Sequence, residues 1–293
     1  MRHDPDPYVV DWAEKASGLV AMARDDQQWY EQLAAALVRP ADRVAVDIGC
    51  GGGGMTMALA AALGAPGRVV AVDAEPEVLA AVRGRLAERS RPLAGVTLVA
   101  ADLAGGMEPV RAALPAPADL VWASAAVHHL GDQQAAVGTL AGMLGPGGRL
   151  ALAEGGLPAR HLPWDLGIGE PGLELRLDAA NDRWFARMRA ELPGSVPMPY
   201  GWTEALRRAG LTGVTTRTTL REQPAPLTEP DRRALADRFD RWVDRLRPTG
   251  LLDPADLAAW DRLLDPADPA WLGHRSDLFR LSARSVHLAV RPG

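Results

Sequence analysis

The sequence predicts an α/β fold in which strands and helices alternate and polar residues gather at one edge of a parallel sheet. Four short apolar runs, at 44–48, 68–73, 96–101 and 119–124, each have an acidic or polar residue in their last two positions or directly after them, and Ala- and Leu-rich stretches such as 55–63 separate them. Parallel strands bring their carboxyl ends to the same edge of a sheet. We therefore expect these polar residues to lie together there.

The first element is the apolar strand 44–48, which opens almost directly into four consecutive glycines at 51–54. A helix is expected over 55–63, and its free N–H groups and positive dipole end would face a ligand lying over the glycines. Glycine is needed where φ is positive or where a ligand lies against bare backbone. The segment therefore predicts a loop that binds a nucleotide cofactor.

Two glycine spacings fit this loop. Gly49, Gly51 and Gly54 match the G-x-G-x-x-G pattern of dinucleotide folds, whereas Gly49, Gly51 and Gly53 match G-x-G-x-G. Asp47 favours the second interpretation, because a dinucleotide-binding strand usually carries an apolar residue at that position. A carboxylate there suits a cationic group, such as the ammonium of an amino-acid moiety.

The next two strands each lead to an acid. Asp73 ends the run 68–73, at about the distance from the glycines where a βαβ unit places a ribose-binding carboxylate. Asp102 follows the run 96–101 and is placed to accept a hydrogen bond from an exocyclic adenine amine. The fourth strand, 119–124, leads into the sequence Ala-Ala-Val-His-His-Leu.

In combination these residues resemble the class I, Rossmann-like S-adenosylmethionine-dependent methyltransferases. The match is close over 40–155 and looser over 200–221 and 283–291, and it includes the Gly-Pro-Gly-Gly turn at 145–148 that feeds a fifth strand at 149–154. The resemblance implies a seven-stranded Rossmann-like methyltransferase sheet with strand seven antiparallel. It adds N-terminal lid helices and helical insertions after strands five and six.

The resemblance also implies S-adenosylmethionine as cofactor, with S-adenosylhomocysteine as product. Asp47 would face the ammonium side, Asp73 the ribose and Asp102 the adenine. The expected cofactor-binding residues are Asp47, Gly49, Cys50, Gly51, Gly53, Asp73, Ala74, Ala101, Asp102, Leu103 and Ser124. Cys50, the single cysteine, is expected to be a small residue under the loop rather than a nucleophile.

Two N-terminal helices are expected within residues 1–40, before the catalytic domain at 41–293, because apolar residues recur there at helical spacing. The resemblance suggests that they form a lid over the cofactor, with Tyr8 and Trp12 in the substrate pocket. Packing of these aromatic residues onto the sheet is the alternative.

A substrate cap is expected at 155–200, which is too long for a plain connection and too apolar for a free loop. Its apolar residues would wall a pocket above the carboxyl ends of the strands. The substrate-binding candidates are His161, Trp164, Arg176 and Tyr200. Surface or packing roles are the alternative for most of them.

A helical insertion is expected at 222–282, between strand 214–220 and the last strand, 285–290, which the family pairs antiparallel. Its apolar residues recur at helical spacing, as in the stripe Leu235, Phe239, Trp242, Val243 and Leu246. Such a stripe favours packing inside the protein, and a homodimer interface is the second interpretation.

A sulfonium methyl group is already activated, so the protein must mainly hold the acceptor in line with the methyl carbon and exclude water. His128 and His129 follow strand four, whose end approaches the methyl group in this family, and they are the first candidates for a general base. Glu154, at the end of strand five, is a weaker candidate, because a helix cap or an ion pair explains it as well. No metal is expected, since Asp132 alone is too little for a divalent metal site.

Composition is typical of a cytoplasmic enzyme: the chain has 293 residues, 47% of them hydrophobic, a net charge of −5, and no apolar run long enough to cross a bilayer. The acidic balance argues against a nucleic-acid substrate, although a local arginine patch stays open. We therefore expect methyl transfer to a small apolar or aromatic metabolite, such as one of bacterial secondary metabolism. The alternatives are an NAD(P)-dependent oxidoreductase and a non-catalytic cofactor-binding subunit.

Overall fold

The computed structural model of the protein describes residues 16–88 and 93–293. The described chain divides into two compact units. The sheet unit holds the described residues up to Gly155, together with Pro193–Arg217 and Ser285–Gly293. The helical unit holds Gly156–Leu192 and Thr218–Arg284.

The sheet unit is built on five parallel strands in the order β3-β2-β1-β4-β5. These strands are β1 (Val44–Ile48), β2 (Arg68–Asp73), β3 (Gly95–Ala100), β4 (Ala118–Ser124) and β5 (Leu144–Ala153). The end of β8 (Arg280–Val290) runs antiparallel to β5, and β7 (Thr212–Gln223) pairs with β8. The predicted α/β sheet with an antiparallel last strand is confirmed.

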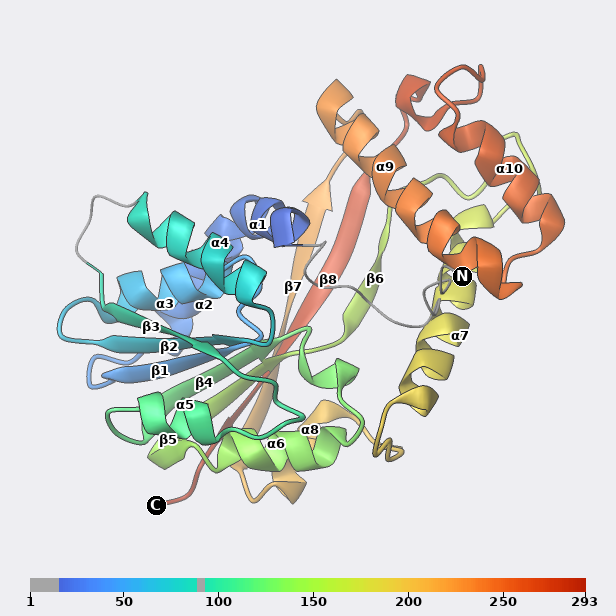
Figure 1. Ribbon diagram of the computed structural model, residues 1–293. Helices are drawn as coiled ribbons and strands as arrows, with labels where there is room; N and C mark the ends of the chain where they lie inside the picture. The colour runs from blue at the N-terminus through green and yellow to red at the C-terminus, as the bar shows by residue number, and fades with distance from the viewer. Residues whose placement is uncertain (1–15, 89–92) are drawn as a thin grey trace, which may run out of the picture. The chain divides into compact units, whose positions relative to one another are not determined.

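Helices cover both faces of this sheet (Figure 1). They are α1 (Ala16–Asp25), α2 (Gln27–Leu37), α3 (Gly54–Leu63), α4 (Pro76–Ala87), α5 (Glu108–Ala113), α6 (Gln133–Ala141) and α8 (Trp202–Arg208). The alternation of side chains along β1 explains the two layers, because successive residues of a strand point to opposite faces. Val46 packs with residues of α5, α6 and α8, and Ala45 packs with α2 and α3.

The first described helices lie against the glycine loop. The backbone oxygen of Leu19 in α1 is so close to Gly52 that a Cβ atom there would lie 2.2 Å from it. Gly52 is therefore glycine because a helix occupies its side-chain space. Tyr8 and Trp12 lie outside the described residues, and the lid role of the N-terminal segment stays a prediction.

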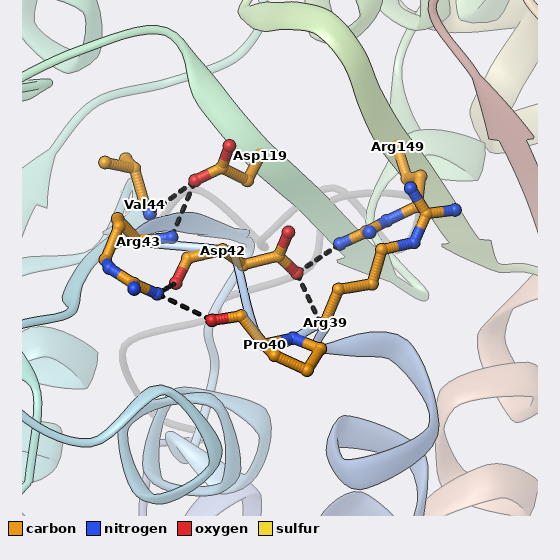
Figure 2. A network of polar contacts seen from close by, with 7 residues as sticks. All are labelled: Arg39, Pro40, Asp42, Arg43, Val44, Asp119 and Arg149. Atoms are coloured by element: carbon orange, nitrogen blue, oxygen red, sulfur yellow. Dashed lines mark hydrogen bonds and ion pairs between the residues drawn. The ribbon is translucent and has the colours of Figure 1, made fainter.

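The amino end of the sheet is held by a polar network (Figure 2). Asp42 Oδ2 accepts hydrogen bonds from Arg149 Nη2 at 2.5 Å and from the Arg39 backbone N–H at 2.6 Å. Asp119 Oδ2 accepts from the Val44 backbone N–H at 2.9 Å. Arg149 is only 2% exposed, so its charge depends on Asp42 for compensation. The network joins the segment before β1 to β4 and β5.

The helical unit has its own apolar core. It contains β6 (Gly156–Arg160), α7 (Leu173–Glu191), α9 (Glu229–Leu246), η2 (Arg247–Thr249), α10 (Pro254–Leu264) and η3 (Leu272–His274). Phe239 of α9 and Trp260 of α10 are fully buried, with ring centroids 4.9 Å apart. Four members of the apolar stripe of α9 are buried within this core, and Trp242 packs against it half-buried, so the stripe packs inside the unit.

Strand β6 was not predicted. It pairs antiparallel with the first part of β8, and its residues are exposed or half-exposed, so no apolar pattern marks it. None of the described helices has the length and apolar character needed to cross a membrane. Over 16–88 and 93–293, no group of three His, Cys, Asp or Glu residues is arranged to hold a metal ion.

Candidate active site

The loop between β1 and α3 adopts a conformation that favours glycine at alternate positions. Gly49, Gly51 and Gly53 have φ values of +64°, +49° and +73°, which side chains of L-residues rarely adopt. Gly54 is already the first residue of α3, and a Cβ atom there would lie 2.4 Å from the Tyr30 ring. The backbone therefore follows the G-x-G-x-G spacing.

Space is left where a cofactor would meet this loop. Gly51 is half-buried, and a Cβ atom built on it would have no neighbour nearer than 3.9 Å. The opposite side of the loop is filled, because Arg85 of α4 is buried and donates a hydrogen bond to the Gly52 carbonyl oxygen. The protein thus fixes one side of the loop and leaves the other open.

Asp47 is buried beneath the loop, with 1% exposure, and accepts a 2.5 Å hydrogen bond from the Thr56 hydroxyl of α3. Burial, the largest cause, and the nearby charge of Asp73 raise the pKa of Asp47 from 3.8 to about 7, against the opposing effect of the Thr56 hydrogen bonds. Asp47 is therefore close to half ionised at neutral pH. A cationic group bound nearby would favour the ionised form.

Asp73 joins the end of β2 to the loop. Its Oδ2 accepts from the Gly51 backbone N–H at 2.9 Å, and its Oδ1 accepts from the Glu75 N–H at 3.2 Å. Each carboxylate oxygen can accept a further hydrogen bond. The half-buried Asp73 therefore has the capacity to hold ribose hydroxyls.

Cys50 is a buried residue whose thiol pKa is raised well above its usual range by burial and by the charges of Asp47 and Asp73. A thiol that stays protonated is a poor nucleophile. This environment supports the predicted packing role of Cys50.

The expected adenine-binding residues lie at the ends of β2 and β3, which pair in register. Asp102 is exposed, and its Oδ1 accepts from the Ala104 backbone N–H at 2.9 Å. Ala74 is also exposed, whereas Ala101 and Leu103 are half-buried against the core.

The turn after β4 is strained. Ala125, which follows the half-buried Ser124, has a φ of 48° and is the one non-glycine residue with positive φ in the described parts of the chain. Such residues persist where the surroundings hold them in place, and they are frequent at functional sites. Here the Ala125 N–H is held by the Ala153 carbonyl oxygen at 3.2 Å.

Glu154 organises this turn. Its Oε1 accepts from the backbone N–H groups of Ala126 at 3.0 Å and Val127 at 2.9 Å, and its Oε2 lies 2.6 Å from His128 Nδ1. Glu154 is 1% exposed, and both of its carboxylate oxygens are engaged. It is therefore suited to positioning His128, whose ring centroid lies 4.1 Å from that of His129.

The sequence did not single out His287, which supports the same turn from β8. Its Nε2 lies 3.1 Å from the Glu154 carbonyl oxygen, and its Nδ1 lies 2.8 Å from the Thr216 hydroxyl of β7. Burial lowers the pKa of His287. The available sequence signal was a histidine inside a largely apolar strand, because such a residue needs polar partners. In the structure, His287 pairs with Leu152 of β5.

The described substrate candidates fall in both units. Tyr200, in the sheet unit, donates a hydrogen bond to Gln134 at 3.1 Å, and the Arg208 guanidinium lies 3.9 Å from its ring centroid. His161, Trp164 and Arg176 belong to the helical unit.

These three residues of the helical unit have different surroundings. Trp164 is 67% exposed. Arg176 forms a two-point ion pair with Asp256 at 2.7 and 2.8 Å, which raises the pKa of Arg176. His161 is fully buried. Trp164 therefore offers the most open apolar surface of the three.

The sheet and the loop define an α/β domain for a nucleotide cofactor. Comparisons with known proteins identify the family to which this domain belongs. Residues 46–150 match a family model described as a methyltransferase domain. The trans-aconitate 2-methyltransferase of Methylobacterium radiotolerans is 31% identical over 276 residues, which cover 86% of this chain and 87% of that protein.

Two similar solved structures illustrate the range of the structural matches. One is a methyltransferase candidate from Bacillus halodurans, with 16% identity, 92% coverage of this chain, 100% coverage of that chain and a TM-score of 0.49. The other is an amino pentose methyltransferase from Micromonospora echinaspora with bound S-adenosylmethionine, with 25% identity, 53% and 59% coverage and a TM-score of 0.33.

The chain belongs to the class I S-adenosylmethionine-dependent methyltransferases. It is an enzyme of that class, and its cofactor is S-adenosylmethionine. The residues at the strand ends fit this cofactor, because the open side of Gly51 lies beside the carboxylate of Asp73. The predicted activity and cofactor are confirmed, whereas the roles of the individual site residues stay predictions.

Proposed function

We propose that this enzyme transfers the methyl group of S-adenosylmethionine to a carboxylate oxygen of a small carboxylic acid, forming a methyl ester. The similarity to trans-aconitate 2-methyltransferase carries this proposal, because it covers 86% of the chain and so extends well beyond the methyltransferase domain at 46–150. The similarity therefore includes residues of the helical unit.

The cofactor supplies an electrophilic methyl carbon on a sulfonium. The acceptor oxygen uses a lone pair to form the O–CH₃ bond, and the electrons of the broken S–CH₃ bond stay on sulfur, which leaves S-adenosylhomocysteine. A carboxylic acid is ionised at neutral pH, so its oxygen needs no base. This requirement suits the site, because both oxygens of Glu154 are already engaged by donors. In this proposal Glu154 holds His128, and the histidines orient the acceptor.

A small apolar or aromatic metabolite, as in bacterial secondary metabolism, is the second candidate. The observation in its favour is the exposed indole of Trp164, a ring on which an aromatic substrate could pack. A phenol acceptor would need to lose a proton, and His128 or His129 would then act as base. Cytoplasmic location, exclusion of nucleic acid as substrate and a homodimer stay predictions.

The test is a transfer assay with methyl-labelled S-adenosylmethionine and a panel of small molecules. The panel contains trans-aconitate, citrate, tricarballylate and benzoate as acids, and catechol and a naphthol as phenols. We expect label in a base-labile methyl ester of at least one acid. Transfer to a phenol and to no acid would overturn the proposal in favour of the second candidate.

A further inference from the structure

Two arginines of the helical unit differ from most other arginines of that unit. Arg238 of α9 and Arg280 of β8 have neither a hydrogen bond nor an ion pair within the described residues. The Arg238 guanidinium lies over the Trp242 ring at 4.6 Å, and the Nε of Arg280 is buried with no hydrogen-bond partner. By contrast, Arg233 of the same helix pairs with Glu229 at 2.5 Å.

The backbone brings Arg280 close to His161. The N–H of Phe279 donates to the His161 carbonyl oxygen at 3.1 Å, and the next strand pairing joins Arg160 to Leu281. On the other side, the His161 ring meets the ring of Phe239, the residue after Arg238, edge to face with centroids 5.6 Å apart. The three polar side chains therefore project from elements that meet at His161.

His161 also has an unsatisfied atom. It is fully buried, its Nδ1 lies 2.9 Å from Glu174 Oε1, and its Nε2 has no hydrogen-bond partner in the part of the chain that the structure describes. Burial lowers the pKa of His161, Glu174 opposes that shift, and the charges of Arg238 and Arg280 add to it. Because Nδ1 donates to Glu174 and the lowered pKa keeps the ring neutral, Nε2 is a hydrogen-bond acceptor, and the anion-binding groups here are the arginines.

The charge around these residues is positive. Burial, the largest cause, and the charges of Arg280, Arg241 and Arg284 together lower the pKa of Arg238 to about 10, with Glu174 opposing. The charges of three other arginines therefore act on Arg238 in a partly desolvated region. Such a cluster is costly unless an anion compensates it.

Two acids whose charges interact with these arginines already have hydrogen-bond partners. Glu174 accepts from the backbone N–H groups of His161 and Leu162 as well as from His161 Nδ1. Asp231, whose pKa Arg280 helps to lower, accepts from Thr228 and Gln223 side chains. Among residues 16–88 and 93–293, the Arg238 and Arg280 donors therefore have no hydrogen-bond or ion-pair partner.

We propose that Arg238 and Arg280 form a binding site for carboxylate groups of a small di- or tricarboxylic acid. The arginine fork matches a carboxylate in two-point geometry. Several cations act here together, so a polycarboxylate compensates the cluster better than a monocarboxylate does. This assignment rests on the proposed function, and it names a polycarboxylic acid as the class of ligand that these two residues of the helical unit bind.

The experiment measures binding separately from turnover. Calorimetry follows tricarballylate binding to the protein saturated with S-adenosylhomocysteine, for the wild type, Arg238→Gln, Arg280→Gln and the control Arg233→Gln. We expect each of the first two variants to bind tricarballylate at least tenfold more weakly. S-adenosylhomocysteine affinity stays unchanged in all four proteins, and the control binds tricarballylate like the wild type.

Thermal unfolding distinguishes a binding role from a structural one. Removing one charge from a like-charged cluster relieves repulsion, so the Tm of unliganded Arg238→Gln should equal or exceed the wild-type value, while the tricarballylate-induced rise in Tm disappears. If the unliganded Tm falls and the ligand-induced rise persists, the arginine is structural and the proposal is wrong.

The outcomes also separate this site from the proposed function. Methylation of acids with unchanged tricarballylate binding in both variants overturns the site and leaves the function standing. Arginine-dependent tricarballylate binding without methylation of any acid overturns the function and leaves the site. Inorganic phosphate or acetate binding as tightly as tricarballylate to the wild type overturns the assignment to a polycarboxylate.

Discussion

Asp47→Asn should make the enzyme more stable at alkaline pH while weakening cofactor binding. The carboxylate is buried, and its pKa is raised from 3.8 to about 7. Between pH 3.8 and about pH 7, Asp47 therefore keeps its proton in the folded state but has lost it in the unfolded state. As the pH rises through this window, wild-type stability falls, and above about pH 7 the loss levels off. Asparagine does not titrate, so the free energy of unfolding of the variant does not fall with pH for this reason.

The magnitude follows from the pKa shift. Three pKa units correspond to about 4 kcal/mol in total, and about 2.5 kcal/mol of that arises between pH 5 and pH 8. The amide side chain of the variant would keep an oxygen as acceptor for the Thr56 hydroxyl, and the stronger hydrogen bond of the charged carboxylate is already included in the pKa of about 7. Asparagine resembles the protonated acid, so we expect the variant to exceed the wild type by about 4 kcal/mol at pH 8.

Urea unfolding followed by circular dichroism checks this expectation at pH 5 and pH 8. Comparing the two proteins at each pH cancels the other titrating groups. The reasoning on Asp47 is wrong if the free-energy difference between wild type and variant is the same at both pH values.

Cofactor affinity provides an independent check. If the ammonium of S-adenosylmethionine faces Asp47, binding requires the ionised carboxylate, and the ionised fraction rises from about one tenth at pH 6 to about nine tenths at pH 8. Wild-type affinity should therefore rise about tenfold more over this range than that of Asp47→Asn. Parallel pH profiles would place the ammonium elsewhere.

The remaining predictions concern three other residues. Asp73→Ala should weaken S-adenosylmethionine binding about 10- to 100-fold by calorimetry, because a charged acceptor for hydroxyls is lost; unchanged affinity would remove the ribose assignment. His129→Ala should keep cofactor affinity and lower the turnover of labelled methyl transfer, and equal turnover would show that the side chain is not needed. Asp42→Asn should destabilise the sheet unit by about 3–5 kcal/mol in urea unfolding, because Arg149 is left buried without an anion; a loss below about 1 kcal/mol would show that water compensates the charge.

The sheet was predictable because its central strands are buried on both faces and therefore read as continuous apolar runs. The residues of β1 are all buried, as are four of the six residues of β2. Strand β6 lacks this signal, since its residues are exposed or half-exposed and its pairing with β8 depends on contacts distant in sequence. Local pattern predicts an element only where burial constrains its composition.

The positions of candidate residues were predictable where a strand end supplies the side chain, whereas their binding roles stay predictions. Asp47, Asp73 and Asp102 follow from their positions alone, but Thr56 was missed, although a polar residue in the first turn of an Ala-rich helix above Asp47 was a usable signal. The hydrogen bonds of Glu154 could not be predicted, because they depend on the strained turn at Ala125.

Both proposed binding residues, Asp47 and Arg238, are ionisable groups whose charged form is disfavoured by burial, one acidic and one basic. Asp47 is a carboxylate that burial pushes toward neutrality, and Arg238 is a guanidinium whose pKa burial and like charges lower. Each residue would gain more from an oppositely charged ligand than an exposed ion pair does, because the cost of removing its charge from water has already been met in folding. Ammonium would then stabilise the sheet unit through Asp47, and a polycarboxylate would stabilise the helical unit through Arg238. The two stabilisations should respond to separate variants, which makes the cofactor and substrate assignments independently testable.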